Sequence, residues 1–336
     1  MGPLRRIALL IITCVSLYLV GPAVLDVFAT WPAVRDLDPF LMQLIVIAQG
    51  GVFLCQWVLL RITLRERRWL NVAASQLAAT AASRVLPGGG AAANALQYAM
   101  LVRGGVPSAA AASGLTAASL MLTGTVFALP ALALPAVIGG TGIDRDLARA
   151  AWAGAAALVL LVAAGALLLL TDAPLRTSGR LVQRAVDRLR RRERPRDDLA
   201  DRLLLERDVI RDVLRSDWPA ALLATAGRWA FDYGALLLAL LAVGARPSPS
   251  AVLLTFCVAQ ALSLIPLTPG GLGFVEAGLT GTLALAGVAA GDALVAVLAY
   301  RLAAYWLPLP VGAVAYLIHG RSFPKIAKAA PAGPAG

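Results

Sequence analysis

The feature that most constrains this chain is an interrupted apolar segment, SLIPLTPGGLGFVEAGL, which runs from Ser263 to Leu279. The apolar run stops at Pro266 and Pro269, turns through several glycines, and restarts as a helix that carries one carboxylate, Glu276. Proline lacks a backbone donor and glycine adopts conformations that other residues avoid, so the pattern predicts a helix broken inside a hydrophobic segment. At membrane depth such a break is tolerated only within protein or beside a water-filled cavity. The segment therefore predicts a site.

Composition indicates a membrane protein. The 336 residues are 59% hydrophobic and 15% charged, whereas soluble domains average about 25% charged residues. We expect an all-α polytopic membrane protein with about six transmembrane helices of roughly 20 residues each, together with two re-entrant helical hairpins in an inverted repeat. The net charge of +11 does not indicate a nucleic-acid partner, because no nucleic-acid motif accompanies it.

Cysteine and histidine usage argues against several kinds of chemistry. Cys14, Cys55 and Cys257 are isolated within apolar stretches, and His319 is the single histidine. This pattern indicates neither a disulfide framework nor a metal site, and it removes histidine-based triads from consideration. We therefore expect no catalytic residues, no metal and no cofactor.

Apolar runs and basic loops divide the chain into two membrane halves, 1–171 and 218–320. Between them lies a hydrophilic stretch, 172–217, with thirteen Arg against ten Asp plus Glu. It predicts a charged cytoplasmic helical linker, and residues 321–336 predict a disordered basic tail. The expected spans are 7–28, 39–60, 108 into 130–135, 151–171, 218–243 and 293–318, and the expected re-entrant hairpins are 69–105 and 251–291.

The placement of basic residues orients these spans. Of the 30 Lys and Arg residues, 23 fall on the side assigned as cytoplasmic. An asymmetry of this size predicts a multi-pass plasma-membrane protein with both termini in the cytoplasm. The four assigned to the outside are Arg35, Arg145, Arg149 and Arg246.

The two halves align with each other at an offset of 182 residues. Pro87 then falls on Pro269, and Gly88 and Gly89 fall on Gly270 and Gly271. The same shift moves the second expected span onto the fifth, which crosses the membrane in the opposite sense. The pattern predicts an inverted repeat whose hairpins enter from opposite sides, an arrangement typical of transporters. For the first hairpin, a single ordinary span with a flexible glycine turn is the alternative.

Five charged residues fall well inside apolar segments: Arg84, Arg228, Asp232, Glu276 and Arg301. Each costs about 2.5–3.5 kcal/mol at mid-bilayer, so we expect them to face one shared interior. Structural explanations compete with a binding role. Arg228 and Asp232 are four residues apart and can neutralise each other, Glu276 can be only a counter-ion for Arg301, and Arg84 can extend to the interface.

The functional interpretation joins these residues into one anion site. Helix N-termini after the two Pro-Gly-Gly turns present unpaired N–H groups, the three arginines add positive charge, and Glu276 and Asp232 balance it. Asn94 occupies the position in the first half that Glu276 occupies in the second. The predicted substrate-binding residues are Arg84, Pro87, Gly88, Gly89, Asn94, Arg228, Asp232, Pro269, Gly270, Gly271, Gly273, Glu276 and Arg301.

The run IPLTPGGLGFVEAG resembles the signature of the lysylphosphatidylglycerol synthase transmembrane family, also called flippase-like domain proteins. The family carries Pro-Gly-Gly-x-Gly-x-x-Glu in its second half, which is matched here by Pro269, Gly270, Gly271, Gly273 and Glu276. The resemblance implies movement of a phospholipid or lipid-linked sugar between leaflets, sometimes beside a synthase or glycosyltransferase. The first-half element lacks the Glu that the family usually carries, and this leaves the lipid open.

We therefore expect a flippase, not an enzyme, that moves an anionic phospholipid or a polyprenyl-phosphate-linked sugar by alternating access around a midplane polar site. The main alternative is a non-transporting membrane subunit that scaffolds a lipid-modifying synthase or glycosyltransferase. A membrane-embedded transferase is a third interpretation, but the Asp-rich metal motif that it needs is absent from the sequence.

Overall fold

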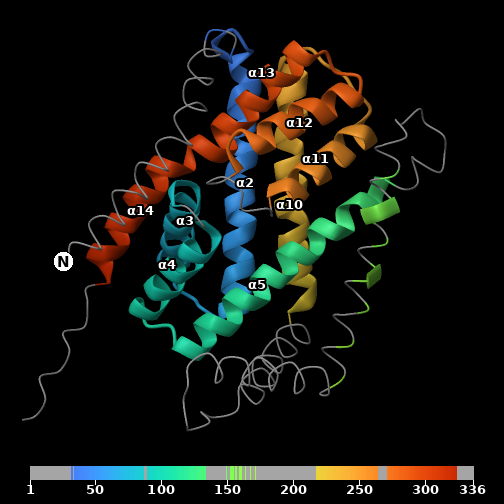
Figure 1. The fold of residues 1–336 in the computed structure, drawn as a ribbon. Coiled ribbons are helices and arrows are strands. Elements are labelled where there is room, and N and C mark those ends of the chain that lie inside the picture. The colour runs from blue at the N-terminus through green and yellow to red at the C-terminus, as the bar shows by residue number, and fades with distance from the viewer. Residues whose placement is uncertain are drawn as a thin grey trace, which may run out of the picture.

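The computed structural model describes residues 34–86, 89–133, 217–263 and 271–323, together with Pro32 and isolated positions between 149 and 171. Every regular element in these ranges is a helix, so the predicted all-α class is confirmed (Figure 1). The predicted first span at 7–28, most of the fourth, residues 172–216 of the predicted linker and the tail beyond 323 lie outside the described residues.

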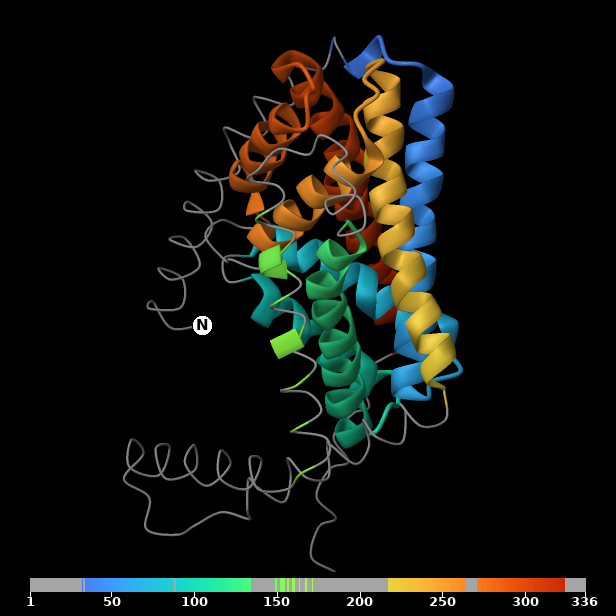
Figure 2. The same cartoon turned by 90° about the vertical axis from the view of Figure 1, so that its right-hand side faces the viewer.

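Two long helices, α2 (Pro39–Leu64) and α10 (Trp218–Ala242), lie side by side, and Figure 2 shows most of the other described helices on one side of this pair (Figures 1 and 2). The sequence explains where α2 begins. The Asp38 carboxylate accepts a hydrogen bond from the Phe40 N–H at 2.9 Å, and proline occupies the first helical position, where its missing N–H costs nothing.

Small residues allow the close approach of α2 and α10. Gly51 faces the Phe231 ring, and Gly227 faces the Cys55 sulfur. A Cβ added at Gly51 would lie 2.8 Å from carbons of that ring, closer than van der Waals contact. Since residue 51 meets 231 and residue 55 meets 227, numbers fall along α10 as they rise along α2. The two helices are therefore antiparallel, with the small-residue contacts typical of membrane helices.

Two pairs of short helices contact α2 or α10, mainly through the first helix of each pair. The first pair is α3 (Trp69–Val85) and α4 (Gly89–Arg103), and the second is α11 (Pro249–Ser263) and α12 (Phe274–Leu285). Helices of 17, 15, 15 and 12 residues are shorter than the roughly 20 residues that cross a bilayer. Figures 1 and 2 place α3 and α4 near one end of α2 and α11 and α12 near the other.

Each pair is a helical hairpin. Gly104 at the end of α4 lies against Asn71 at the start of α3. In the second pair the Thr255 hydroxyl donates to the Thr282 carbonyl at 3.3 Å, and Gly278 lies against Leu262. The range 69–105 thus contains two helices packed on each other, and the single-span alternative for it is wrong. The two helices of the second pair span 249–285, so the last residues of the predicted range 251–291 belong to the next helix. The turn residues 87–88 and 264–270 lie outside the described part of the chain.

The hairpins end in the same backbone arrangement, 182 residues apart. Gly105 and Gly287 both have positive φ, 97° and 87°, which glycine adopts without strain. The closing hydrogen bonds also correspond. After the first hairpin, the N–H groups of residues 104, 105 and 106 donate to the carbonyls of residues 100, 102 and 101, respectively. After the second, residues 286, 287 and 288 donate in the same order to the carbonyls of residues 282, 284 and 283.

The C-terminal end of the described chain is one long helical run with a distortion in it. It consists of α13 (Ala290–Arg301), a π-helical segment η3 (Leu302–Trp306) and α14 (Pro308–Ser322). In η3 the Leu307 N–H bonds to the carbonyl of Leu302, five residues back, at 3.0 Å. Pro308 has no N–H, so it offers no helical donor to the Ala304 carbonyl.

Three described helical stretches are long and apolar enough to cross a membrane: Pro39–Leu64, Ser108–Val126 and Ala290–Ser322. They coincide with the predicted second, third and sixth spans. The middle one belongs to α5 (Ser108–Ala128), which continues into the short 3₁₀ turn η1 (Leu129–Ala133). Helix α10 lies at the predicted fifth span but is not one of these three stretches, because Arg228 and Asp232 lower its mean hydropathy.

Candidate functional site

A cavity of about 530 Å³ lies where both hairpins meet α2, α10 and the last helical run. Four of the five predicted intramembrane charges line it, namely Arg84, Arg228, Asp232 and Arg301. The structure thus brings together residues that are up to 217 positions apart in the sequence. The neutral polar part of the lining consists of two tyrosines, Tyr300 and Tyr305, and six smaller side chains: Gln49, Gln56, Thr80, Ser83, Gln260 and Ser263.

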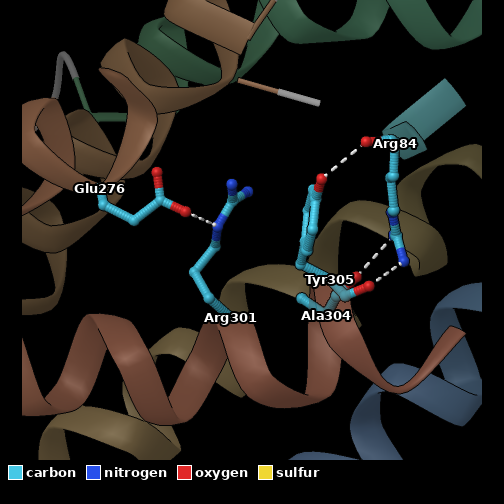
Figure 3. A network of polar contacts seen from close by, with 5 residues as sticks. All are labelled: Arg84, Glu276, Arg301, Ala304 and Tyr305. Carbon is cyan, nitrogen blue, oxygen red and sulfur yellow. Dashed lines mark hydrogen bonds and ion pairs between the residues drawn. The ribbon is translucent and has the colours of Figure 1, made fainter. Parts of the chain in front are cut away.

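The fifth charge, Glu276, reaches the cavity through its partner. Its Oε1 lies 2.6 Å from Nε of Arg301, and the two side chains are 16% and 12% exposed (Figure 3). Glu276 is in the first turn of α12, where the helix dipole favours a carboxylate. Its second oxygen, Oε2, is buried without a hydrogen-bond partner. The pair links the second hairpin to the last helical run.

Arg84 links the first hairpin to the same run. Its Nη2 donates to the Ala304 carbonyl at 2.6 Å and its Nη1 to the Tyr305 carbonyl, while the Tyr305 hydroxyl donates to the Arg84 carbonyl at 3.0 Å (Figure 3). The Ala304 carbonyl is the one that Pro308 leaves without a helical donor. Arg84 therefore satisfies a polar group that the proline and the π segment leave open.

The Tyr305 ring lies between two guanidinium groups. Its centroid is 5.0 Å from Cζ of Arg84 and 4.6 Å from Cζ of Arg301. The ring face is electron-rich, so both contacts are cation–π interactions that stabilise charge away from bulk water. One buried aromatic side chain thus separates two cations that would otherwise repel each other.

Asp232 has partners that differ from the expected one. Its carboxylate, 6% exposed, accepts hydrogen bonds from Tyr300 Oη at 2.7 Å, Gln49 Nε2 at 3.0 Å and Gln260 Nε2 at 3.3 Å. Arg228, one turn away on the same helix, is not among these donors. The direct Arg228–Asp232 pair that the four-residue spacing favours is therefore not how this carboxylate is satisfied.

Arg228 lines the cavity with unused donors. Its Nε and Nη1 are buried and have no hydrogen-bond partner. Its guanidinium carbon lies 3.9 Å from the Trp229 ring centroid, which supplies a cation–π contact but accepts no strong hydrogen bond. A buried donor without a partner costs about 1–3 kcal/mol, more when it is charged. An acceptor brought into the cavity would remove that cost.

The remaining predicted site residues divide into three groups. Gly89 and Gly271 line the cavity. Gly273 caps α12 with a positive φ of 78°, but it does not line the cavity, and Asn94 is exposed on α4 and does not line it either. The positions outside the described residues are Pro87, Gly88, Pro269 and Gly270.

Sequence reasoning missed the neutral members of the site. Gln49, Gln260 and Tyr300 hold Asp232, and Tyr305 separates the arginines. The two glutamines carried a usable signal, because amide side chains inside apolar helices commonly hydrogen-bond across helices. Within the part of the chain that the structure describes, no group of three or more His, Cys, Asp or Glu residues is placed to hold a metal ion.

Comparison with known proteins gives one match over most of the chain. The sequence model of the family described as the lysylphosphatidylglycerol synthase TM region matches residues 6–312. A UPF0104 membrane protein of Methanothermobacter thermautotrophicus is 35% identical over 95 residues, which is 28% of this chain and 27% of the relative. The chain thus matches only about a quarter of that relative's length. No solved structure matches the chain.

Proposed function

Because the chain belongs to the family of lysylphosphatidylglycerol synthase transmembrane regions, we propose that this membrane protein is a flippase. It moves an anionic phospholipid or a lipid-linked sugar between leaflets, with the headgroup in the cavity and the chains in the bilayer. The observation that carries the proposal is the convergence of Arg84, Arg228 and Arg301 on one cavity from three distant segments. A charged side chain is energetically costly inside a membrane, and those found within a membrane helix bundle typically mark a substrate pathway.

We propose that the two halves are related as an inverted repeat, which permits alternating access. The offset that pairs the closing turns at Gly105 and Gly287 also places α2 on α10, and these two helices are antiparallel. Units related in this way have opposite orientations, so the hairpin α3–α4 opens to the cytoplasm and the hairpin α11–α12 to the outside. Rocking of one half against the other then exposes the cavity to each side in turn.

The remaining assignments follow from this proposal. The protein acts as a transporter without catalytic residues, metal or cofactor, and its partner is the transported lipid. A synthase or glycosyltransferase that makes or uses this lipid is a further partner. Both termini lie in the cytoplasm, as the distribution of basic residues indicates.

The test is headgroup transfer in liposomes. Purified protein is reconstituted with fluorescent phosphatidylglycerol, and transfer is the fraction of label that an impermeant reductant can reach. Glu276→Gln and Arg301→Ala reduce transfer to the protein-free rate, because each disrupts the ion pair beside the cavity. Arg246→Gln, which removes a positive charge from an exposed loop residue, leaves transfer unchanged.

Two outcomes contradict the proposal at different points. Wild-type transfer in both Glu276→Gln and Arg301→Ala overturns the site. The proposed flippase function is overturned if the wild-type protein transfers neither phosphatidylglycerol nor a polyprenyl-phosphate sugar. A lipid-modifying enzyme that co-purifies with such a protein would then favour the scaffolding subunit.

A further inference from the structure

The charged groups around the cavity differ in how many of their polar atoms already have a hydrogen-bond or ion-pair partner. Arg84 is bonded to two carbonyls, Arg301 is paired with Glu276, and Asp232 accepts three hydrogen bonds from neutral donors. Among these three lining arginines, only Arg228 has buried guanidinium nitrogens, Nε and Nη1, without a hydrogen-bond partner. The cavity therefore has an unused cationic donor at one defined place.

We propose, resting on the flippase function above, that Arg228 anchors the ligand of this cavity and that the ligand is a singly charged phosphodiester with a neutral polyol substituent. The guanidinium fork matches two phosphate oxygens, which makes it the side chain best suited to this group. The guanidinium group of Arg228 lies over the Trp229 ring, with Cζ 3.9 Å from the ring centroid, so the fork is oriented before the ligand arrives.

The charge of the site selects the class of phosphate. Three guanidinium groups, those of Arg84, Arg228 and Arg301, meet two carboxylates, those of Asp232 and Glu276, which leaves one positive charge. One phosphodiester carries one negative charge and neutralises it. A diphosphate or a phosphate monoester brings about two and leaves an excess negative charge in a membrane interior, where such charge is costly.

The neutral lining selects the other substituent. The hydroxyls of Ser83 and Ser263 donate to backbone carbonyls at 2.8 and 2.7 Å, so their lone pairs stay available to accept from ligand hydroxyls. Thr80 accepts from Gln76 at 2.9 Å and keeps its own proton for donation. These groups suit glycerol or a hexose. Among the described lining residues the one carboxylate is Asp232, which three donors already occupy, so an ammonium headgroup finds no free carboxylate on this wall of the cavity.

Equilibrium binding tests the inference separately from transport. Protein in detergent is titrated with dihexanoyl phosphatidylglycerol, with dihexanoyl phosphatidylethanolamine and with a short polyprenyl-phosphate hexose. Arg228→Gln weakens binding of the preferred phosphodiester by at least about tenfold, as loss of charge-assisted hydrogen bonds predicts. Arg228→Lys restores part of it, because lysine keeps the charge without the fork. Arg246→Gln binds within about twofold of wild type, since an exposed loop charge adds little.

Thermal unfolding separates an anchoring residue from a structural one. Removal of a buried donor that has no partner in the ligand-free protein leaves the melting temperature of Arg228→Gln at or above that of wild type. A large fall in melting temperature together with unchanged binding shows a structural role and overturns the inference.

The ligand series distinguishes the remaining outcomes. Binding of the glycerol lipid or the hexose lipid, with the ethanolamine lipid at least about tenfold weaker, supports the inference and identifies the source of the phosphodiester. Equal binding of the ethanolamine lipid, or wild-type binding by Arg228→Gln, overturns it. If the variant binds normally while wild-type protein still transfers lipid in liposomes, only the anchoring role fails and the proposed function stands.

Discussion

Glu276 and Arg301 form an ion pair between the second hairpin and the last helical run, with 2.6 Å between Oε1 and Nε. Both side chains are more than four-fifths buried. Removing one member of such a pair leaves the other charge uncompensated, so we expect Arg301→Ala to lower the unfolding free energy by about 3–5 kcal/mol. The measurement is unfolding of the purified protein in mixed micelles.

A double-mutant cycle checks that this cost comes from the stranded carboxylate. Glu276→Gln removes that charge, so the combined variant Glu276→Gln, Arg301→Ala is expected to lose less than the sum of the single changes, by about 0.5–3 kcal/mol. Additive effects would show that the two side chains do not act as a pair.

Arg84 and Pro308 should be energetically coupled through the Ala304 carbonyl. Arg84→Gln removes the charged donors to the carbonyls of Ala304 and Tyr305, and we expect a loss of about 1.5–3 kcal/mol. Pro308→Ala supplies the missing helical N–H, so the loss caused by Arg84→Gln should be smaller in that background. Hydrogen exchange of the amides in η3 reports the same coupling. An equal loss in both backgrounds would contradict it.

Gly312 sets the packing of α14 on α3. A Cβ at this position would lie 2.4 Å from the Leu77 carbonyl oxygen, which is backbone and cannot rotate away. We expect Gly312→Ala to cost about 1–3 kcal/mol. Gly320→Ala is the matched control on the same helix, because a Cβ there meets nothing within 4 Å. Melting temperatures of the two variants should differ clearly, and similar values would show that the helices can separate without cost.

The proposed inverted repeat predicts that equivalent positions of the two halves face opposite sides of the membrane. Ser108 and Ala290 are both exposed, and each begins the helix that follows a hairpin. With Cys14, Cys55 and Cys257 replaced by alanine, Ser108→Cys should react with an impermeant maleimide only from the cytoplasmic side and Ala290→Cys only from outside. Labelling of both from one side would rule out the inverted arrangement.

The sequence was sufficient to predict the elements that depend on local chemistry. A proline followed directly by two or more glycines interrupts an apolar helix, so the ranges 69–105 and 251–291 could be predicted as broken helices. The five intramembrane charges could be predicted to share an interior, because the cost of a charge in lipid does not depend on the details of packing. The structure brings four of them to one cavity and joins Glu276 to it through Arg301.

The partners within that interior could not be predicted. Spacing on a helix favours contact between Arg228 and Asp232, but Gln49 and Tyr300 approach the carboxylate from α2 and α13 and replace that contact. Asn94 was assigned by analogy with Glu276, yet the rotation of α4 leaves it exposed. Which face of a helix is turned inward depends on long-range packing. Polar and apolar residues are mixed around α4, so it has no apolar stripe that would identify its buried face.

The last helical run carries the attachments of both hairpins within a single turn. Arg301 binds α12, and the carbonyls of Ala304 and Tyr305, three and four residues later, bind Arg84 of α3. A shift or rotation of this run therefore displaces both contacts at once, so the movements of the two hairpins are mechanically coupled. One hairpin can move independently of the other only if one of these attachments is broken first.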